Sequence, residues 1–338
     1  MLQAISSPEV QRLALAYGTL LALAYKKRMG ILPGGIIVPG LVVVLTLLSP
    51  LWCLTGLVLA PLLLLVYRRW LQRPEHIRRS PMYFLAGLSL LVSNLVALAY
   101  IRLGWLPPSL DELSGTLLPG ILACTLHRQQ PARVLRGVAL TTLATALLLL
   151  LTVLLLTVLL LQHLGIDLNA IARAYAAYGP EPVLRLQAHG LSFALALLVG
   201  FLLYRSSGLR PGGYVVAPVA AALLRQTTSA VFLILGCALV MAMLRLLEAQ
   251  SLTVGLRRYG AALLFSILWV WGVELWCLQR GVAVLPFQGN HLFVIIAMAS
   301  YANDLVLQPR RRVLPLMAVS VLVALAVQQL LALLLPQY

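Results

Sequence analysis

The sequence predicts an all-α, polytopic integral membrane protein of about 12 crossings, arranged as two parallel six-helix repeats that contain short broken helices. Three observations lead to this fold class. Apolar runs without a charged residue recur along the whole chain, basic residues fall in alternate loops, and one proline- and glycine-rich segment occurs twice. Together they predict where the helices cross, in which direction, and how the two halves are related.

The apolar runs are too long and too numerous for the core of a soluble protein. The 338 residues are 62% hydrophobic and only 10% charged, whereas a soluble domain carries about 25% charged residues. A helix needs about 20 apolar residues to cross about 30 Å of hydrocarbon. The crossings predicted in the first half are 8–25, 30–48, 51–67, 81–101, 113–127 and 138–162. Those predicted in the second half are 187–204, 211–224, 228–247, 259–279, 290–307 and 313–335.

Basic residues are concentrated in every second loop of this arrangement. Nineteen of the 25 Lys and Arg residues lie on one side, and Glu9, Asp111, Glu112, Asp167 and Glu181 lie on the other. The positive-inside rule makes the basic side cytoplasmic and places both termini outside. The net charge of +16 then reflects orientation and contact with anionic lipid headgroups or another anionic partner. No nucleic-acid partner is expected.

An internal repeat divides the chain. The segment Gly30–Val38, with the sequence GILPGGIIV, recurs 178 residues later as Gly208–Val216, with the sequence GLRPGGYVV. Each copy follows an apolar run that ends in a tyrosine and a basic residue. Because each unit has an even number of crossings, the two units are expected to be parallel rather than inverted. The predicted domains are a first repeat at 1–162, an external linker at 163–185 and a second repeat at 186–338.

The repeated segment is an elbow that interrupts an apolar run near the membrane boundary. Proline lacks an amide hydrogen, and glycine lowers helix stability by about 1 kcal/mol. Irregular backbone persists in hydrocarbon only where protein or water covers it, and a broken helix presents amide hydrogens that suit an anion. The alternative interpretation is close packing of helices through small residues. The candidates for the elbow or a polymer path are Gly30, Pro33, Gly34, Gly35, Pro39, Gly40, Gly208, Pro211, Gly212 and Gly213.

A second interruption, Pro119-Gly120, precedes a basic turn in the first repeat and joins the same set of candidates. Ionisable residues within membrane spans are costly and indicate a functional role by default. For Glu274 the alternative is a pair with an arginine inside the bundle, and for His127 it is an interfacial histidine. The polar candidates are His127, Arg128, Gln129, Glu274, Asn303 and Asp304.

No motif for catalysis or cofactor binding is found in the sequence. It contains no GxxxxGK[ST] phosphate loop, no HExxH and no GxSxG. Its four cysteines lie far apart inside apolar runs and form no CxxC pair, so neither a zinc site nor a disulfide framework is indicated. We therefore expect no catalytic residue, no metal and no cofactor bound by this chain.

The two interrupted segments resemble the motifs of the PgsC/CapC family, the membrane subunit of poly-γ-glutamate synthesis. Gly30–Gly40 follows a basic turn, as the first family motif does, and Leu118–Gln129 corresponds to the second. The resemblance is strong over 8–162 and weak over 186–338, where Leu307 replaces the arginine of the second motif. Family members are usually single units, so this chain resembles a fused, tandem-duplicated form.

The resemblance implies a place in a bacterial complex at the inner membrane. A cytoplasmic PgsB/CapB-like amide ligase that uses ATP with Mg would join glutamates, and an external PgsA/CapA-like subunit would accompany it. This chain, not catalytic alone, would hold the ligase at the lipid bilayer and help pass the anionic polymer outward. Two alternatives remain: a secondary transporter of a small anionic substrate, which also uses tandem repeats and broken helices, and a non-conducting membrane scaffold.

Overall fold

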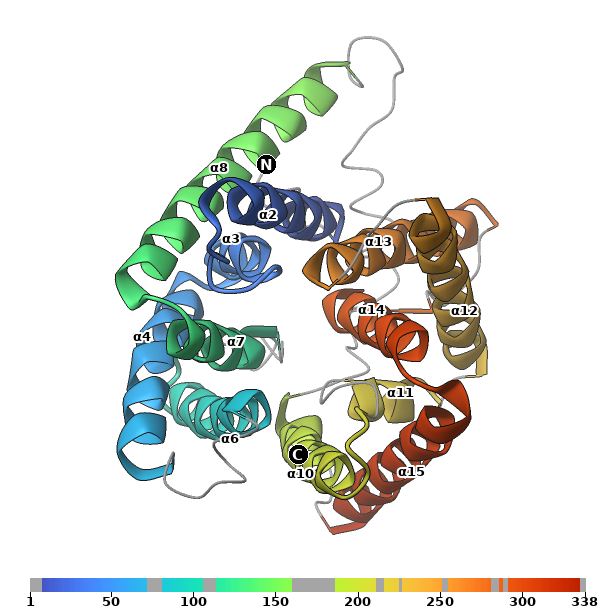
Figure 1. Ribbon diagram of the computed structural model, residues 1–338. Helices are drawn as coiled ribbons and strands as arrows, with labels where there is room; N and C mark the ends of the chain where they lie inside the picture. The colour runs from blue at the N-terminus through green and yellow to red at the C-terminus, as the bar shows by residue number, and fades with distance from the viewer. Residues whose placement is uncertain are drawn as a thin grey trace.

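The computed structural model confirms the predicted fold class: the chain is a bundle of α-helices, with no strand among the residues that it describes (Figure 1). The described residues are 8–71, 81–105, 114–159, 186–210, 216–224, 227–250, 255–280, 286–287 and 291–334. The predicted linker at 163–185 and the elbow residues Pro211, Gly212 and Gly213 lie outside them.

The first unit contains six α-helices in its described part, and a short π-helical turn, η1, follows α4 directly. The helices are α2 (Pro8–Met29), α3 (Val38–Leu48), α4 (Pro50–Val66) with η1 (Tyr67–Leu71), α6 (Pro81–Arg102), α7 (Ser114–Arg128) and α8 (Pro131–Leu159). The second unit repeats this order. Its described helices are α10 (Leu186–Ser207), α11 (Val216–Leu223), α12 (Thr227–Gln250), α13 (Leu256–Gln279), α14 (His291–Leu307) and α15 (Arg310–Leu334).

Helices at the same place in the two units also have the same neighbours. In the first unit α7 packs between α4 and α6, and α2 packs against α3 and α8. In the second unit α14 packs between α12 and α13, and α10 packs against α11 and α15. The repeat recognised in the sequence is therefore a repeat of tertiary packing as well.

The short helices α3 and α11 are the interior elements of their units. α3 is buried from Val38 to Leu45, and all eight residues of α11 are buried. At 1.5 Å per residue these helices are about 16 Å and 12 Å long, well short of a membrane crossing. The crossing predicted at 30–48 therefore divides into an elbow and a short helix, because proline and glycine prevent a helix from starting earlier. Of the crossing predicted at 211–224, the described part is the short helix α11 and Leu224.

The two units dock side by side through two corresponding contacts, α2 with α13 and α6 with α10 (Figure 1). Gly260, near the start of α13, packs on Leu23, near the end of α2. Arg12, near the start of α2, pairs with Glu274, near the end of α13. The basic residues that end α2 and begin α13 thus lie on the same side, so the repeats are parallel, as the even number of crossings predicted.

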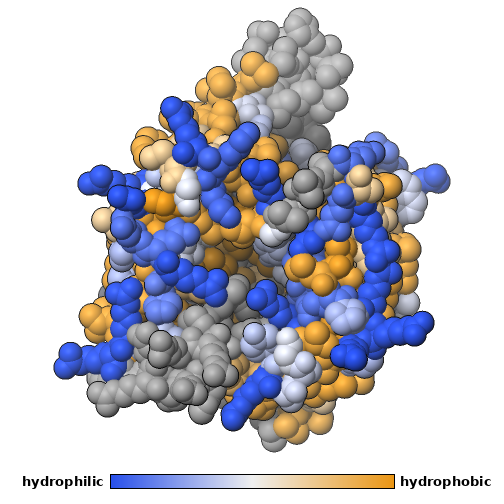
Figure 2. Space-filling view, viewed as in Figure 1, coloured by the Kyte–Doolittle hydropathy of each residue, from blue (hydrophilic) through white to orange (hydrophobic). Residues whose placement is uncertain are grey.

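The outer surface of the bundle suits a membrane. Large apolar side chains are exposed along the outside of α4, α8, α12 and α15, and Figure 2 shows apolar flanks beside one face where hydrophilic residues gather over both halves. Five stretches of the described helices are long and apolar enough to cross a bilayer: Pro50–Arg69, Pro131–Leu155, Thr227–Gln250, Leu256–Cys277 and Arg310–Leu330. The protein is therefore an all-α membrane protein.

Candidate functional site

Gly30 and Gly208 end the first helix of each unit in the same way. Both have positive φ, 71° and 68°, which L-amino acids with a side chain adopt only with strain. The amide of Gly30 donates to the carbonyl oxygen of Lys26 at 2.9 Å, and the amide of Gly208 donates to that of Tyr204 at 2.8 Å. These glycines are helix C-caps, and each is the first residue of its repeated segment.

The elbow of the first unit turns at Gly34 and Gly35 in a space too small for side chains. Their φ values are 71° and 136°. A Cβ atom on Gly34 would lie 2.8 Å from a methyl group of Val138 in α8, and one on Gly35 would lie 2.8 Å from a methyl group of Ile121 in α7. The elbow is therefore enclosed by α7 and α8, which is the protein cover that irregular backbone needs in a membrane.

A glutamine at the end of α7 or α14 holds the elbow of its own unit. The amide of Leu32 donates to Oε1 of Gln129 at 3.1 Å. In the second unit the amide of Arg210 donates to Oε1 of Gln308 at 2.7 Å, and Nε2 of Gln308 donates to the carbonyl oxygen of Arg210 at 3.2 Å. The predicted polar candidate Gln129 thus ties the elbow to the end of α7, and Gln308 is its counterpart.

Thr125, one turn before Gln129, makes a second tie in the first unit. Its hydroxyl group donates to the carbonyl oxygen of Gly34 at 2.8 Å. Thr125 is buried, so this bond satisfies a carbonyl group that water does not reach. The corresponding residue of the second unit is Asp304, which is also buried; the counterpart of Gly34, Gly212, lies outside the described residues.

Two further candidate glycines serve close packing of helices. A Cβ atom on Gly40 of α3 would lie 2.7 Å from the carbonyl oxygen of Ala14 in α2, and one on Gly120 of α7 would lie 2.9 Å from Cα of Ala86 in α6. A Cβ atom on Gly18 of α2 would lie closer still to the backbone of Gly40, 2.6 Å from its Cα. Small residues let helix backbones approach in a membrane, so the packing interpretation accounts for these positions. Pro39 lies at the start of α3 and Pro119 lies inside α7.

The last turn of α7 meets η1, the turn that follows α4. The ring of His127 contacts the ring of Tyr67 edge-on, with centroids 5.1 Å apart and an interplanar angle of 79°. Arg128 is exposed, as are Arg68 and Arg69 in η1. The contact gathers the basic ends of these helices into one surface, with His127 half-buried at its edge.

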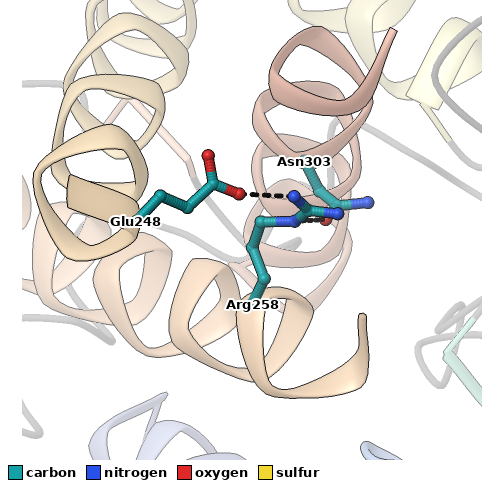
Figure 3. Close-up of polar contacts among 3 residues, drawn as sticks. All are labelled: Glu248, Arg258 and Asn303. Atoms are coloured by element: carbon teal, nitrogen blue, oxygen red, sulfur yellow. Dashed lines mark hydrogen bonds and ion pairs between the residues drawn. The ribbon is translucent and has the colours of Figure 1, made fainter. Parts of the chain in front are cut away.

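In the second unit the corresponding helix ends are joined by an ion pair (Figure 3). Nη1 of Arg258, at the start of α13, pairs with Oε1 of Glu248, near the end of α12. Nε of Arg258 donates to Oδ1 of Asn303 in α14 at 3.2 Å. The candidate Asn303 therefore helps to hold three helix ends together. Because Arg258 is buried, its charge is compensated internally rather than presented on the surface.

Glu274 has its partner in the other unit. Nη2 of Arg12 in α2 donates to Oε2 of Glu274, and both side chains are 0% exposed. The structure therefore supports the interpretation of Glu274 as one half of an ion pair within the bundle. Sequence reasoning did not identify Arg12, although an arginine inside the apolar run 8–25 was a usable signal.

Sequence reasoning also missed residues whose importance lies in what they pack against. Gly18 and Glu248 belong to no motif by themselves, and only their contacts distinguish them. Within the described part of the chain no three His, Cys, Asp or Glu side chains gather as metal ligands do. The described arrangement consists of the enclosed elbow of the first unit, tied helix ends in both units and a basic surface.

Both halves of this chain match a known protein family. The family described as capsule biosynthesis CapC matches it twice, over residues 17–135 and 195–305. No curated protein and no solved structure matches it. The first match contains the elbow, Thr125 and Gln129, and the second contains the Arg258 ion pair and Asn303. The protein therefore belongs to the capsule biosynthesis CapC family as a tandem-duplicated member with a role in capsule biosynthesis.

Proposed function

We propose that this protein is the membrane subunit of a complex that makes and exports a capsule-like anionic polymer, poly-γ-glutamate. It holds a cytoplasmic, CapB-like amide ligase at the bilayer, and an external CapA-like subunit completes the complex. ATP, with Mg, belongs to the ligase. The observation that carries this proposal is the match of both halves to the CapC family, together with the basic surface that the tied helix ends create.

The basic surface supports an anionic partner through its exposed charges. Lysine and arginine side chains gathered on one face attract anions and raise their local concentration. Arg258 does not contribute, because Glu248 neutralises it. The exposed basic residues at these helix ends are Lys27, Arg28, Arg68, Arg69, Arg128, Arg133, Arg136, Arg205, Arg210, Arg245, Arg257, Arg311 and Arg312.

The basic surface is expected to face the cytoplasm, following the positive-inside rule. In a chain without its four native cysteines, an impermeant thiol reagent should not label Arg133→Cys or Arg257→Cys from outside intact cells, and should label both after permeabilisation. Leu103→Cys is the matched control. Leu103 follows the last residue of α6, at the end of the bundle opposite the basic surface, and is 61% exposed, so it should be labelled without permeabilisation. Labelling of Arg133→Cys from outside would show that the orientation is reversed.

The partner ligase should bind the basic surface. We expect a tagged wild-type chain to retain an ATP-dependent amide ligase in a pull-down, and the charge-reversed Arg68→Glu/Arg69→Glu chain to retain at least about tenfold less, as for loss of desolvated charge pairs at an interface. Arg102→Glu reverses an exposed charge at the opposite end of the bundle and should retain the ligase.

The purified chain alone should neither hydrolyse ATP nor make polymer, because no nucleotide-binding motif is present in its sequence. Polymer made by the isolated chain would contradict the proposed division of labour. A chain that binds no ligase and instead takes up a small anion in an ion-coupled way would establish the transporter alternative.

A further inference from the structure

The contact between the two units occurs twice, once on each side of the bundle. α2 packs against α13, and α10, the counterpart of α2, packs against α6, the counterpart of α13 (Figure 1). Gly260 packs on Leu23 at the first contact, and Gly87 packs on Leu197 at the second. Two identical units related by a two-fold axis would make the same two contacts. If backbone packing alone is considered, each unit could dock with a copy of itself, because each has both helices that make this contact.

Among the described residues of the two contacts, an ion pair is present only at the first. Arg12 of α2 and Glu274 of α13 are fully buried and bonded to each other. At the second contact α6 and α10 contain no aspartate or glutamate. The residue that corresponds to Arg12 in α10 is Gly190, and Leu95, beside Asn94, corresponds to Glu274 in α6. The two units are therefore complementary in charge at the first contact, whereas the helices of the second contact supply no carboxylate.

We propose that the Arg12–Glu274 pair determines which unit docks with which, so that the first unit binds the second in preference to a second copy of itself. Docking of two first units would bury Arg12 twice against α6, which has no carboxylate. Docking of two second units would bury Glu274 twice against α10, where Gly190 stands in place of the arginine. Each like-with-like complex would thus lose the charge partner that the observed complex supplies.

The physical basis is the asymmetry between breaking and replacing a buried pair. Removing one partner from a buried charge is strongly unfavourable, whereas replacing both charges by apolar residues of similar size is often neutral. A buried pair therefore discriminates among partners more than it adds affinity, by making the wrong complexes costly. This inference rests on the docking of the units and is independent of the proposed role in polymer synthesis.

The test uses the full chain, folded and then cleaved at a protease site inserted into 163–185. Two preparations whose first units carry different tags are mixed in detergent, and exchange of second units between them confirms that the halves separate and pair again. A pull-down through one tag should retrieve second units and almost none of the other first unit. In Arg12→Met/Glu274→Met the retrieval of the other first unit should rise at least about tenfold, as expected for loss of discrimination by a buried charge.

Two matched variants separate pairing specificity from general stability. The exchanged pair Arg12→Glu/Glu274→Arg should restore the wild-type preference. Glu9→Gln removes a charge one turn from Arg12 on the same helix and should leave the preference unchanged. Equal retrieval of like units by the wild type and by the Met/Met variant, under conditions where second units exchange, would overturn the proposal. A loss of preference in Glu9→Gln equal to that in the Met/Met variant would overturn it as well.

Discussion

Replacing Gly40 by leucine is expected to separate α2 from α3 and to leave little folded protein. A Cβ atom at this position would lie 2.7 Å from the carbonyl oxygen of Ala14 and 2.7 Å from Cα of Leu15. Both are backbone atoms of a packed helix, so no side-chain rotation relieves the overlap. We expect a loss of about 3 kcal/mol or more, the upper part of the range for overpacking, which is a large fraction of the stability of a typical protein.

The folded fraction of the Gly40→Leu variant is measured by size-exclusion chromatography in detergent, alongside polymer output in cells. Gly272→Leu is the matched control, because Gly272 is also a helical glycine and has no atom within 4 Å of its Cβ position. Leucine there should be neutral or stabilising by about 1 kcal/mol. A Gly40→Leu chain that is as stable as Gly272→Leu would contradict the close approach of α2 and α3.

Replacing Gly34 by alanine is expected to abolish polymer output, because one methyl group prevents the elbow from closing. Alanine must adopt φ 71° there, and its Cβ would lie 2.8 Å from a methyl group of Val138 and 3.0 Å from one of Leu122. Backbone strain of about 1–2 kcal/mol then adds to an overlap of about 1–3 kcal/mol. The bond from Thr125 to the carbonyl oxygen of Gly34 should be lost as the elbow moves.

Gly30→Ala isolates the contribution of packing. Gly30 has the same φ of 71° but nothing within 4 Å of its Cβ position, so alanine there carries the strain without the overlap. Thermal denaturation in detergent should place Gly30→Ala between the wild type and Gly34→Ala, with polymer output retained. Equal stability of the two alanine variants would mean that backbone strain alone limits the elbow, and full output from Gly34→Ala would show that its closed form is dispensable.

The fold class follows from features that sequence reasoning handles well. A charge-free run such as 138–162 is interpretable by itself, because the bilayer imposes a minimum length on any helix that crosses it. The repeat of Gly30–Val38 at Gly208–Val216 is equally local, and the two family matches confirm it. The orientation of the basic loops stays a prediction that the labelling experiment tests.

Helix boundaries and the contacts between helices are harder to predict from the sequence. The run 30–48 is apolar throughout, and hydropathy alone does not reveal that the helix begins only at Val38. The elbow was recognisable from its glycines, yet the sequence does not indicate that Gln129 and Thr125 hold it, because those bonds join residues about 90 positions apart. Polymer conduction through the elbow likewise stays a prediction.

The sequence by itself determined that this protein is helical, lies in a membrane and consists of two related units, because these properties depend on composition and on periodic patterns along the chain. Only the tertiary structure decided that Glu274 pairs with Arg12 of the other unit, that Gly18 faces Gly40, and that Glu248 neutralises Arg258. The physical reason is that packing and charge pairing act over a few ångströms in space, between residues whose separation along the chain carries no signal of their contact.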